Sequence, residues 1–251
     1  MNGKKLRRVY DRLLERYGPQ GWWPTTPPGA TTPCYFPAPR EPGQTPYRFS
    51  ADQQWEIIVG AILTQNTSWS NATLALESLL SRGCLSLEHV RRMEHADLAQ
   101  LIHSARYYNQ KARHLQELAT YVFEHHDGDV AAMLRAPGER LRPELLARRG
   151  IGPETADSIM LYAAHHPTFV IDAFARRICV RLGWAAEGVG YAQLQSLFET
   201  ALPRDAEIFN EYHALIVRHA GEHCRPVPVC SSCCLRRMCH HARVAAAATR
   251  Q

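Results

Sequence analysis

The stretch GIGPETAD, residues 150–157, is a glycine turn that runs into a helix, and the later segment FVIDAF places Asp172 20 residues after Gly152. Two kinds of phosphate binder have this pattern. One is the nucleotide loop of a βαβ unit, in which an acidic residue about 20 positions further on holds a ribose. The other is a hairpin between two helices that binds a nucleic-acid backbone. The residues around the turn decide between them.

The sequence does not meet two requirements of the nucleotide loop, which excludes that interpretation. It needs a buried strand before the turn and a third glycine after it. The segment RPELLARR precedes Gly150 and is polar and helical in pattern, and Thr155 holds the third-glycine position. What remains is a helix, a Gly-Ile-Gly turn and a second helix, with Ile151 available to pack between the helices. The free N–H groups of this turn would face one phosphate, although such turns also occur in ordinary helical hairpins.

Helical patterns cover most of the remaining chain. Ser50 is a candidate N-cap for SADQQWEIIVGAILTQ, Gly83 ends SWSNATLALESLLSRG, and Pro153 stands in the first turn of PETADSIMLYAAHH. The nine prolines between Pro19 and Pro46 forbid regular structure in that stretch. Since no alternating strand pattern of any length is found, we predict an all-α fold.

Composition and charge narrow the class of protein. The chain has 251 residues, enough for one large or two modest domains, and a net charge of +5, which permits an acidic partner such as nucleic acid. No apolar run reaches the length of a membrane span, and the basic residues near the N-terminus lead into no signal-like segment. We therefore expect a protein without membrane contact that stays in the cytoplasm, associated with the nucleoid if the source is prokaryotic.

Five of the eight cysteines fall between Cys224 and Cys239. In a chain without an export signal, such clustering indicates a metal centre and not a disulfide framework. Four of them have the spacing C-x5-C-x2-C-x5-C, namely Cys224, Cys230, Cys233 and Cys239. A single C-x2-C with wider arms suits a cubane iron–sulfur cluster better than zinc, which usually uses two short knuckles. A zinc site is the alternative, and Cys234 could compete as a ligand.

Taken together, the segments RRGIGPETADSIMLY, VIDAFARR and CRPVPVCSSCCLRRMC resemble the endonuclease III superfamily of helix–hairpin–helix DNA glycosylases. The resemblance implies a two-lobed all-α fold, a [4Fe–4S] cluster in a C-terminal loop, and base excision repair of damaged double-stranded DNA. It also implies a monomer and a monovalent cation at the hairpin. We expect a six-helix domain over residues 49–164 and a second, discontinuous domain over residues 1–48 and 165–251.

The resemblance assigns roles to individual residues. Gln65 in AILTQNTSW matches the position that enters the DNA stack beside the flipped nucleotide, and Tyr107 in RYYNQKA matches the tip of a second inserting loop. The hairpin residues that would contact the DNA backbone are Gly150, Ile151, Gly152 and Thr155.

The match is closest to the 3-methyladenine glycosylase branch. Two motifs support it, namely WWP at Trp22, Trp23 and Pro24, and LTQNT followed two residues later by Trp69. In that branch these aromatic side chains line the base pocket, and core packing is their alternative role. Only one of two adjacent tryptophans can face a given side, so we expect either Trp22 or Trp23 to face the base.

The reaction requires a carboxylate. Cleavage of the base–sugar bond passes through a cation-like sugar, which a carboxylate can stabilise while it orients or deprotonates water. Asp172 is the candidate, and it could also act as a helix N-cap. In the resembled family, strand-cleaving members use a lysine two residues after the second hairpin glycine, where this chain has Glu154, which we place in the substrate pocket. We expect no lysine to lie near, so the predicted enzyme is a monofunctional glycosylase without lyase activity.

The substrate is the least constrained prediction. An aromatic box favours a cationic alkylated purine, such as 3-methyladenine or 7-methylguanine, through cation–π attraction once the base has left the stack. As a first alternative, the scaffold could act on uracil, thymine mismatches or oxidised pyrimidines, read by Asn66, Asn71 or Glu154. As a second, the chain could be a non-catalytic DNA-binding protein, although the retention of Asp172 argues against that.

Overall fold

The computed structural model describes residues 3–35 and 49–248, and within them it contains helices and no β-strand. Only one isolated bridge, between Thr25 and Cys34, has β-type pairing in the described residues. The chain is therefore all-α, as predicted. The helices are α1 Gly3–Tyr17, α2 Ala51–Leu63, α3 Trp69–Ser81, α4 Leu87–Arg92, α5 His95–Leu101, η1 His103–Ala105, α6 Tyr108–His126, α7 Val130–Leu134, α8 Gly138–Leu146, α9 Pro153–Ser158, η2 Ile159–Ala163, α10 Ala173–Leu182, α11 Tyr191–Glu199, α12 Ala206–Glu222 and α13 His240–Ala248.

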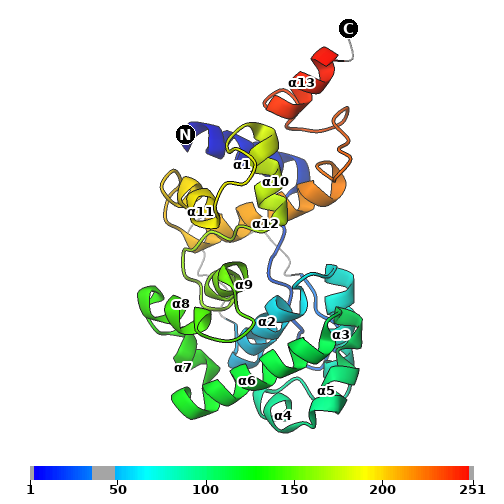
Figure 1. The fold of residues 1–251 in the computed structure, drawn as a ribbon, viewed down its shortest axis with the longest axis vertical. Coiled ribbons are helices and arrows are strands. Elements are labelled where there is room, and N and C mark those ends of the chain that lie inside the picture. The colour runs from blue at the N-terminus through cyan, green and yellow to red at the C-terminus, as the bar shows by residue number, and fades with distance from the viewer. Residues whose placement is uncertain (1–2, 36–48, 249–251) are drawn as a thin grey trace. The chain divides into compact units, whose positions relative to one another are not determined.

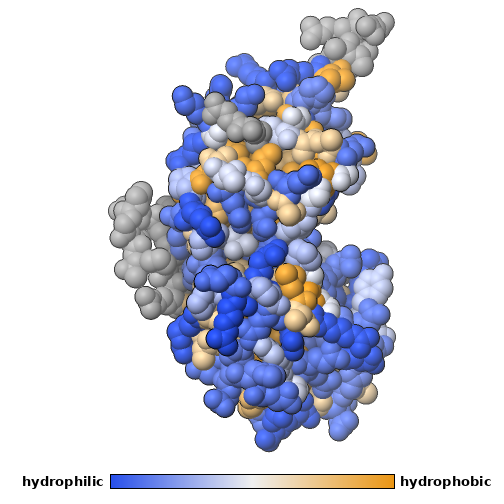
Figure 2. Space-filling view, turned by 60° about the vertical axis from the view of Figure 1, so that its left-hand side comes forward, coloured by the Kyte–Doolittle hydropathy of each residue, from blue (hydrophilic) through white to orange (hydrophobic). Residues whose placement is uncertain are grey.

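The chain divides into two compact units. One consists of Trp23–His166 and is called the central unit below; the other joins Met1–Trp22 to Pro167–Gln251 and is called the terminal unit. Both ends of the chain thus belong to the same unit, as Figure 1 shows for α1 and α13. None of the described helices is long and apolar enough to cross a membrane. On the face drawn in Figure 2, most of the surface is hydrophilic.

Helix α2 lies at the core of the central unit. Ser50 caps it, because its hydroxyl accepts from the Gln53 N–H while the Gln53 side chain accepts from the Ser50 N–H, which completes a capping box. Every residue from Trp55 to Leu63 is buried. A helix that is buried on all sides must be covered by others, and α3, α6, α7, α9 and η2 pack against it (Figure 1).

The boundary of the central unit differs from the expected one. Residues 23–35 belong to it, although we expected it to begin at residue 49. The reason is specific contacts with α2, since the Thr26 N–H and hydroxyl donate to the buried Glu56 carboxylate, the hydroxyl at 2.7 Å. Eight α-helices of the described chain, α2 to α9, lie in this unit where six were expected. Residues 36–48 of the proline-rich stretch lie outside the described residues.

In the terminal unit, α12 is the central helix. Helices α1 and α10 both pack against it. Leu6, Val9 and Leu13 of α1 are buried, as the amphipathic pattern predicts. The Tyr212 hydroxyl of α12 donates to the Leu6 carbonyl at 2.9 Å, which adds a polar contact to this apolar interface. Helix α12 thus carries residues from its middle and its C-terminal end to the two candidate sites described below.

Candidate functional site

The glycine turn of the central unit connects α8 to α9, as predicted. Gly150 has a φ of +77°, and a Cβ built there would lie 2.0 Å from Nδ1 of His114 on α6. Glycine is therefore required at this position for both conformational and steric reasons. Ile151 is buried. Gly152 is the N-cap of α9 and is exposed, with open space where a Cβ would stand.

An ion pair fixes the two helices of the hairpin. Arg142 of α8 donates from Nε to one oxygen of Asp157 at 2.6 Å and from a terminal nitrogen to the other at 3.0 Å. The Asp157 side chain is fully buried. Bidentate pairing of this kind adds geometric precision, and breaking a buried pair is costly. Asp157, the last residue of GIGPETAD, thus holds α9 against α8, a role that its position in the sequence did not indicate.

Gln65 is bound to the hairpin. Its amide donates to the Gly150 carbonyl at 2.8 Å and to the Thr155 hydroxyl at 2.9 Å. In the described structure, the residue expected to enter DNA is therefore held against the turn. The following residue, Asn66, is exposed and has a φ of +52°. Entry of Gln65 into a DNA stack requires these two hydrogen bonds to break.

Tyr107 lies at the tip of an exposed loop between η1 and α6. It is 63% exposed and has a left-handed backbone with a φ of +46°, and Arg106 before it has a φ of +54°. Two consecutive non-glycine residues in this region are strained. Such an exposed aromatic tip on a constrained backbone has the form expected of a residue that fills a gap in DNA.

Lys111 is connected to the hairpin through Gln65. Its ammonium donates to the Gln65 carbonyl at 2.7 Å, and the Gln65 side chain contacts Gly150 and Thr155. Lys111 is therefore linked to the hairpin through one residue, Gln65. Its two other N–H groups donate to the carbonyls of Leu63 and Ala105. Burial lowers the pKa of Lys111 to about 8, so the ammonium is still charged at neutral pH.

The two adjacent tryptophans belong to different units. Trp23 is 5% exposed and packs in the central unit between Trp69, 5.4 Å away between ring centroids, and Tyr162, 5.0 Å away. It also lies over Gly60, where an added Cβ would approach its indole nitrogen to 3.2 Å. Trp23 is thus a core residue that packs against the half-buried Trp69.

Trp22 belongs to the terminal unit and is half-buried. Helix α12 holds its segment, because Asn210 donates to the Trp22 carbonyl at 2.9 Å and Glu211 accepts from the Gln20 N–H at 2.8 Å. The Trp22 ring meets the imidazole of His213 edge-on, with 6.1 Å between centroids.

Asp172 is the N-cap of α10, as predicted. One carboxylate oxygen accepts from the Ala175 N–H at 2.6 Å. The other lies 3.7 Å from Nε2 of His213, beyond hydrogen-bond length but within the range of an ion pair. The Asp172 side chain is 13% exposed. Trp22, His213 and Asp172 therefore form one cluster within the terminal unit.

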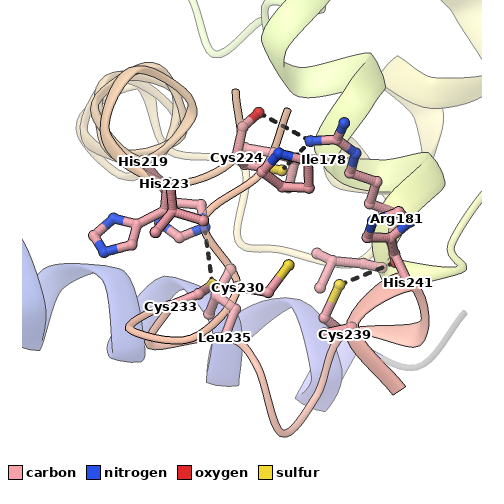
Figure 3. A pocket seen from close by; sticks show the side chains of 14 residues that line it. Ile178, Arg181, His219, His223, Cys224, Cys230, Cys233, Leu235, Cys239 and His241 are labelled. Atoms are coloured by element: carbon pink, nitrogen blue, oxygen red, sulfur yellow. Dashed lines mark hydrogen bonds between the residues drawn. The ribbon is translucent and has the colours of Figure 1, made fainter. Parts of the chain in front are cut away.

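The four cysteines of the predicted cluster motif line one pocket of the terminal unit (Figure 3). Cys224, Cys230, Cys233 and Cys239 all contribute to its wall, together with Arg181, His219, His223 and His241. Cys234 does not line this pocket. Burial raises the pKa of the Cys233 thiol to about 11 and also raises that of Cys239. No three metal-binding side chains among residues 3–35 and 49–248 are close enough to hold one ion.

Arginines of α10 hold the first arm of the cysteine loop. Arg177 donates to the Cys224 carbonyl at 2.7 Å, and Arg181 donates to the carbonyls of Arg225 and Pro226 at 2.6 and 2.8 Å. Arg181 also approaches the Cys224 sulfur at 3.3 Å. Helix α10, which Asp172 caps, therefore contacts the cysteine loop through its C-terminal half.

Two residues of these sites escaped the sequence prediction. Lys111 shares the buried face of α6 with Leu115, Leu118 and Val122, and this i, i+4, i+7, i+11 spacing could have indicated a buried lysine. His213 lies within the apolar run of α12. A histidine on an apolar face is a recognisable signal, but its pairing with Asp172 depends on how α10 and α12 meet.

Known proteins resemble this chain in sequence and in fold. The family model of HhH-GPD superfamily base excision DNA repair proteins matches residues 59–204. The chain is 36% identical over 236 residues to "Putative DNA repair glycosylase MJ1434" of Methanocaldococcus jannaschii, with 93% of this chain and 95% of that protein covered.

Solved structures show the same fold. Endonuclease III trapped as a covalent intermediate with DNA superimposes with a TM-score of 0.75 at 17% identity, over 98% of this chain and 99% of that one. The 3-methyladenine DNA glycosylase MagIII of H. pylori, bound to 1,N6-ethenoadenine, superimposes with a TM-score of 0.67 at 22% identity, over 88% and 98%. At these identities the likeness is one of fold.

Proposed function

Because the chain belongs to the HhH-GPD superfamily of base excision DNA repair proteins, we propose that it is a monofunctional DNA glycosylase that removes alkylated purines from damaged double-stranded DNA. One observation carries the proposal. The candidate acid, Asp172, lies beside His213, which in turn contacts the half-buried ring of Trp22. An aromatic ring and a carboxylate that share one histidine neighbour could serve a flipped, positively charged base and the cationic sugar to which it is attached.

The chemistry assigned to Asp172 uses water as the nucleophile. As the bond between C1′ and the base nitrogen breaks, its electron pair leaves with the base, and an alkylated purine is neutralised without an added proton. Water then adds to C1′ and gives its proton to Asp172. The cap bond from Ala175 occupies one carboxylate oxygen, so the oxygen facing His213 is the one we assign to water.

We propose that half-buried aromatic rings contact the base. Trp22 in the terminal unit and Trp69 in the central unit each have the partial exposure that stacking on a base requires, and each is a separate candidate. Trp23 is buried, so we assign it the support of Trp69 and not contact with the base. Glu154 is exposed on the first turn of α9, and we keep it as a candidate for reading the base edge.

The absence of lyase activity is part of the proposal. Glu154 stands where the resembled lyases have lysine. Lys111, the lysine nearest the hairpin by its contacts, is 2% exposed and uses all three of its N–H groups on backbone carbonyls. Attack on a sugar would require this ammonium to lose a proton and leave all three acceptors.

DNA binding is assigned to the hairpin and two loops of the central unit. The N–H of Gly152, an exposed residue, would face a phosphate, and Tyr107 with either Gln65 or Asn66 would fill the gap left by the flipped base. A monovalent cation at the hairpin would be held by turn carbonyls other than that of Gly150, which already accepts from Gln65.

We also propose a [4Fe–4S] cluster. Such clusters are held by four cysteine thiolates, and four cysteines line one pocket of the terminal unit. When bound, the cluster supplies a cross-link among the arms of the loop. Cys233→Ala should lower the iron and sulfide content of the purified protein, whereas Cys234→Ala, its neighbour outside the pocket, should not. A colourless protein that contains zinc would contradict the cluster.

The function is tested by base release from synthetic duplexes. We expect release of 3-methyladenine and 7-methylguanine, no cleavage of the resulting abasic strand, and no covalent complex after borohydride treatment. Preferred release of uracil, mismatched thymine or 5-hydroxycytosine would replace the substrate class. Tight duplex binding without any release would indicate a non-catalytic protein.

A further inference from the structure

Lys111 is a buried cation that is bound by backbone groups. It is 2% exposed, and its ammonium donates to the carbonyls of Leu63, Gln65 and Ala105 at 2.8, 2.7 and 2.6 Å. An ammonium group has three donors, so these three bonds satisfy it completely. A buried charge is tolerated only where such compensation exists.

The three carbonyls come from two separate segments. Leu63 ends α2, and Gln65 follows it in the segment 64–68, whose exposed residue Asn66 has a φ of +52°. Ala105 ends η1, immediately before Arg106 and Tyr107. These are the two segments that the proposed function assigns to insertion into DNA.

Backbone strain is found in both segments. Asn66, Arg106 and Tyr107 all have left-handed backbones, with φ values of +52°, +54° and +46°. Non-glycine residues keep such conformations only where the surrounding structure over-determines them. The Lys111 ammonium binds the carbonyl immediately before each strained stretch, at Gln65 and at Ala105. It is therefore in a position to keep both tips in their strained form.

The same helix also reaches the hairpin. His114, three residues after Lys111 on α6, lies directly beneath Gly150. The Gln65 side chain, whose own carbonyl is bound by Lys111, donates to Gly150 and Thr155. One chain of hydrogen bonds thus runs from the Tyr107 loop through Lys111 and Gln65 to the hairpin.

We propose that Lys111 is a positioning residue that couples the two DNA-inserting segments, so that the tips at Asn66 and Tyr107 are presented to DNA as one rigid unit. The role of the two segments in DNA insertion rests on the proposed function, whereas their coupling through Lys111 does not. Arginine should not replace lysine fully, because its planar guanidinium cannot place three donors on carbonyls that converge from two segments.

The experiment compares Lys111→Met with a surface control, Lys5→Met, by hydrogen exchange and DNA binding. Lys111→Met keeps the length of the side chain and removes the ammonium. We expect amide exchange to rise at least tenfold in both 64–68 and 104–108, and to stay unchanged in α10 and α12. Affinity for a duplex with an abasic-site analogue should fall about tenfold, while affinity for undamaged duplex should change less than twofold. Lys5→Met should change neither.

The outcomes separate coupling from function. Faster exchange in one segment alone, or in neither, would overturn the proposal. If the parent protein binds the abasic duplex selectively, unchanged affinity of Lys111→Met for that duplex would also overturn it. If the parent protein does not prefer damaged DNA, the proposed function fails, and the exchange data still judge the coupling. If Lys111→Met does not fold, the same exchange measurement on Lys111→Arg decides, with faster exchange in both segments as the supporting result.

Discussion

Lys111 and Asp172 are two charged groups at the two candidate functional regions, and their surroundings differ in one respect. Lys111 is enclosed, and each of its three N–H groups has a carbonyl acceptor. Asp172 has one oxygen bound by the α10 cap, while the other faces His213 without a hydrogen bond from it and the side chain keeps 13% exposure. A fully satisfied charge holds structure in place, whereas a partly satisfied one can still accept a proton or a ligand. The following changes test this distinction, from the largest expected effect to the smallest.

Asp172→Asn should have the largest effect on activity. The amide oxygen can still accept the Ala175 N–H, so the cap is kept while the charge is lost. We expect base release to fall about 1,000-fold, within the range typical for loss of a general base, with little change in Tm. Asp205→Asn is the matched control, because Asp205 caps α12 in the same unit and lies outside the Trp22–His213–Asp172 cluster. Equal activity in the two variants would reduce Asp172 to a cap.

Gly150→Ala should have the largest effect on stability. The new Cβ would meet the His114 ring at 2.0 Å on a backbone with a φ of +77°. We expect a loss of about 3 kcal/mol in the free energy of unfolding, measured with urea. Gly152→Ala, in open space, should cost less than about 1 kcal/mol. Similar losses in both variants would mean that His114 moves away easily and that α6 does not fix the turn.

His213→Gln tests whether the histidine acts through the acid. We expect kcat for base release to fall about tenfold with KM unchanged, because the free oxygen of Asp172 loses its orienting neighbour. The decisive measurement is the double variant with Asp172→Asn. If His213 works only through Asp172, replacing it in the Asp172→Asn variant should cause no further loss of base release. A full second tenfold loss would assign it an independent role.

Glu211→Gln should have the smallest effect, and one that depends on pH. Burial raises the pKa of Glu211 from 4.5 to about 7. Between these values the folded protein holds a proton that the unfolded chain has lost, so this group lowers stability as pH rises from about 4.5 to 7. Above pH 7 the variant should be more stable than the parent by about 1 kcal/mol, and at pH 4 the two should be equal. Urea unfolding at pH 4, 6 and 8 measures this, and a pH-independent difference would contradict it.

Much of the fold could be predicted because its signals are local. Ser50, Asp172 and Pro153 are found at helix starts as predicted, and Gly83 follows the end of α3 with a φ of +64°. Caps, breakers and apolar periodicity act within a few residues, so one sequence suffices to locate them. The boundary at residue 23 was missed, because it depends on Thr26 meeting Glu56, 30 residues away.

The candidate site also has features with local sequence signals and features that depend on distant contacts. The hairpin, the cysteine spacing and Asp172 were visible as motifs. The binding of Gln65 to Gly150, the burial of Trp23 against Trp69 and Tyr162, and the pairing of Asp172 with His213 were not, since each joins residues between 41 and 139 positions apart. Packing over the whole unit determines which faces of two helices meet. No short sequence pattern encodes that choice.

By itself, the sequence determined that the chain is helical, that its glycine turn joins two helices, and that four cysteines share one loop, because residue identity limits local backbone and ligand chemistry. Only the tertiary structure decided which charges are enclosed and which remain available. Lys111 and Asp172 differ in how many partners the surrounding helices bring to them. That number depends on the packing of α2 with α6 and of α10 with α12, not on the residues adjacent in sequence.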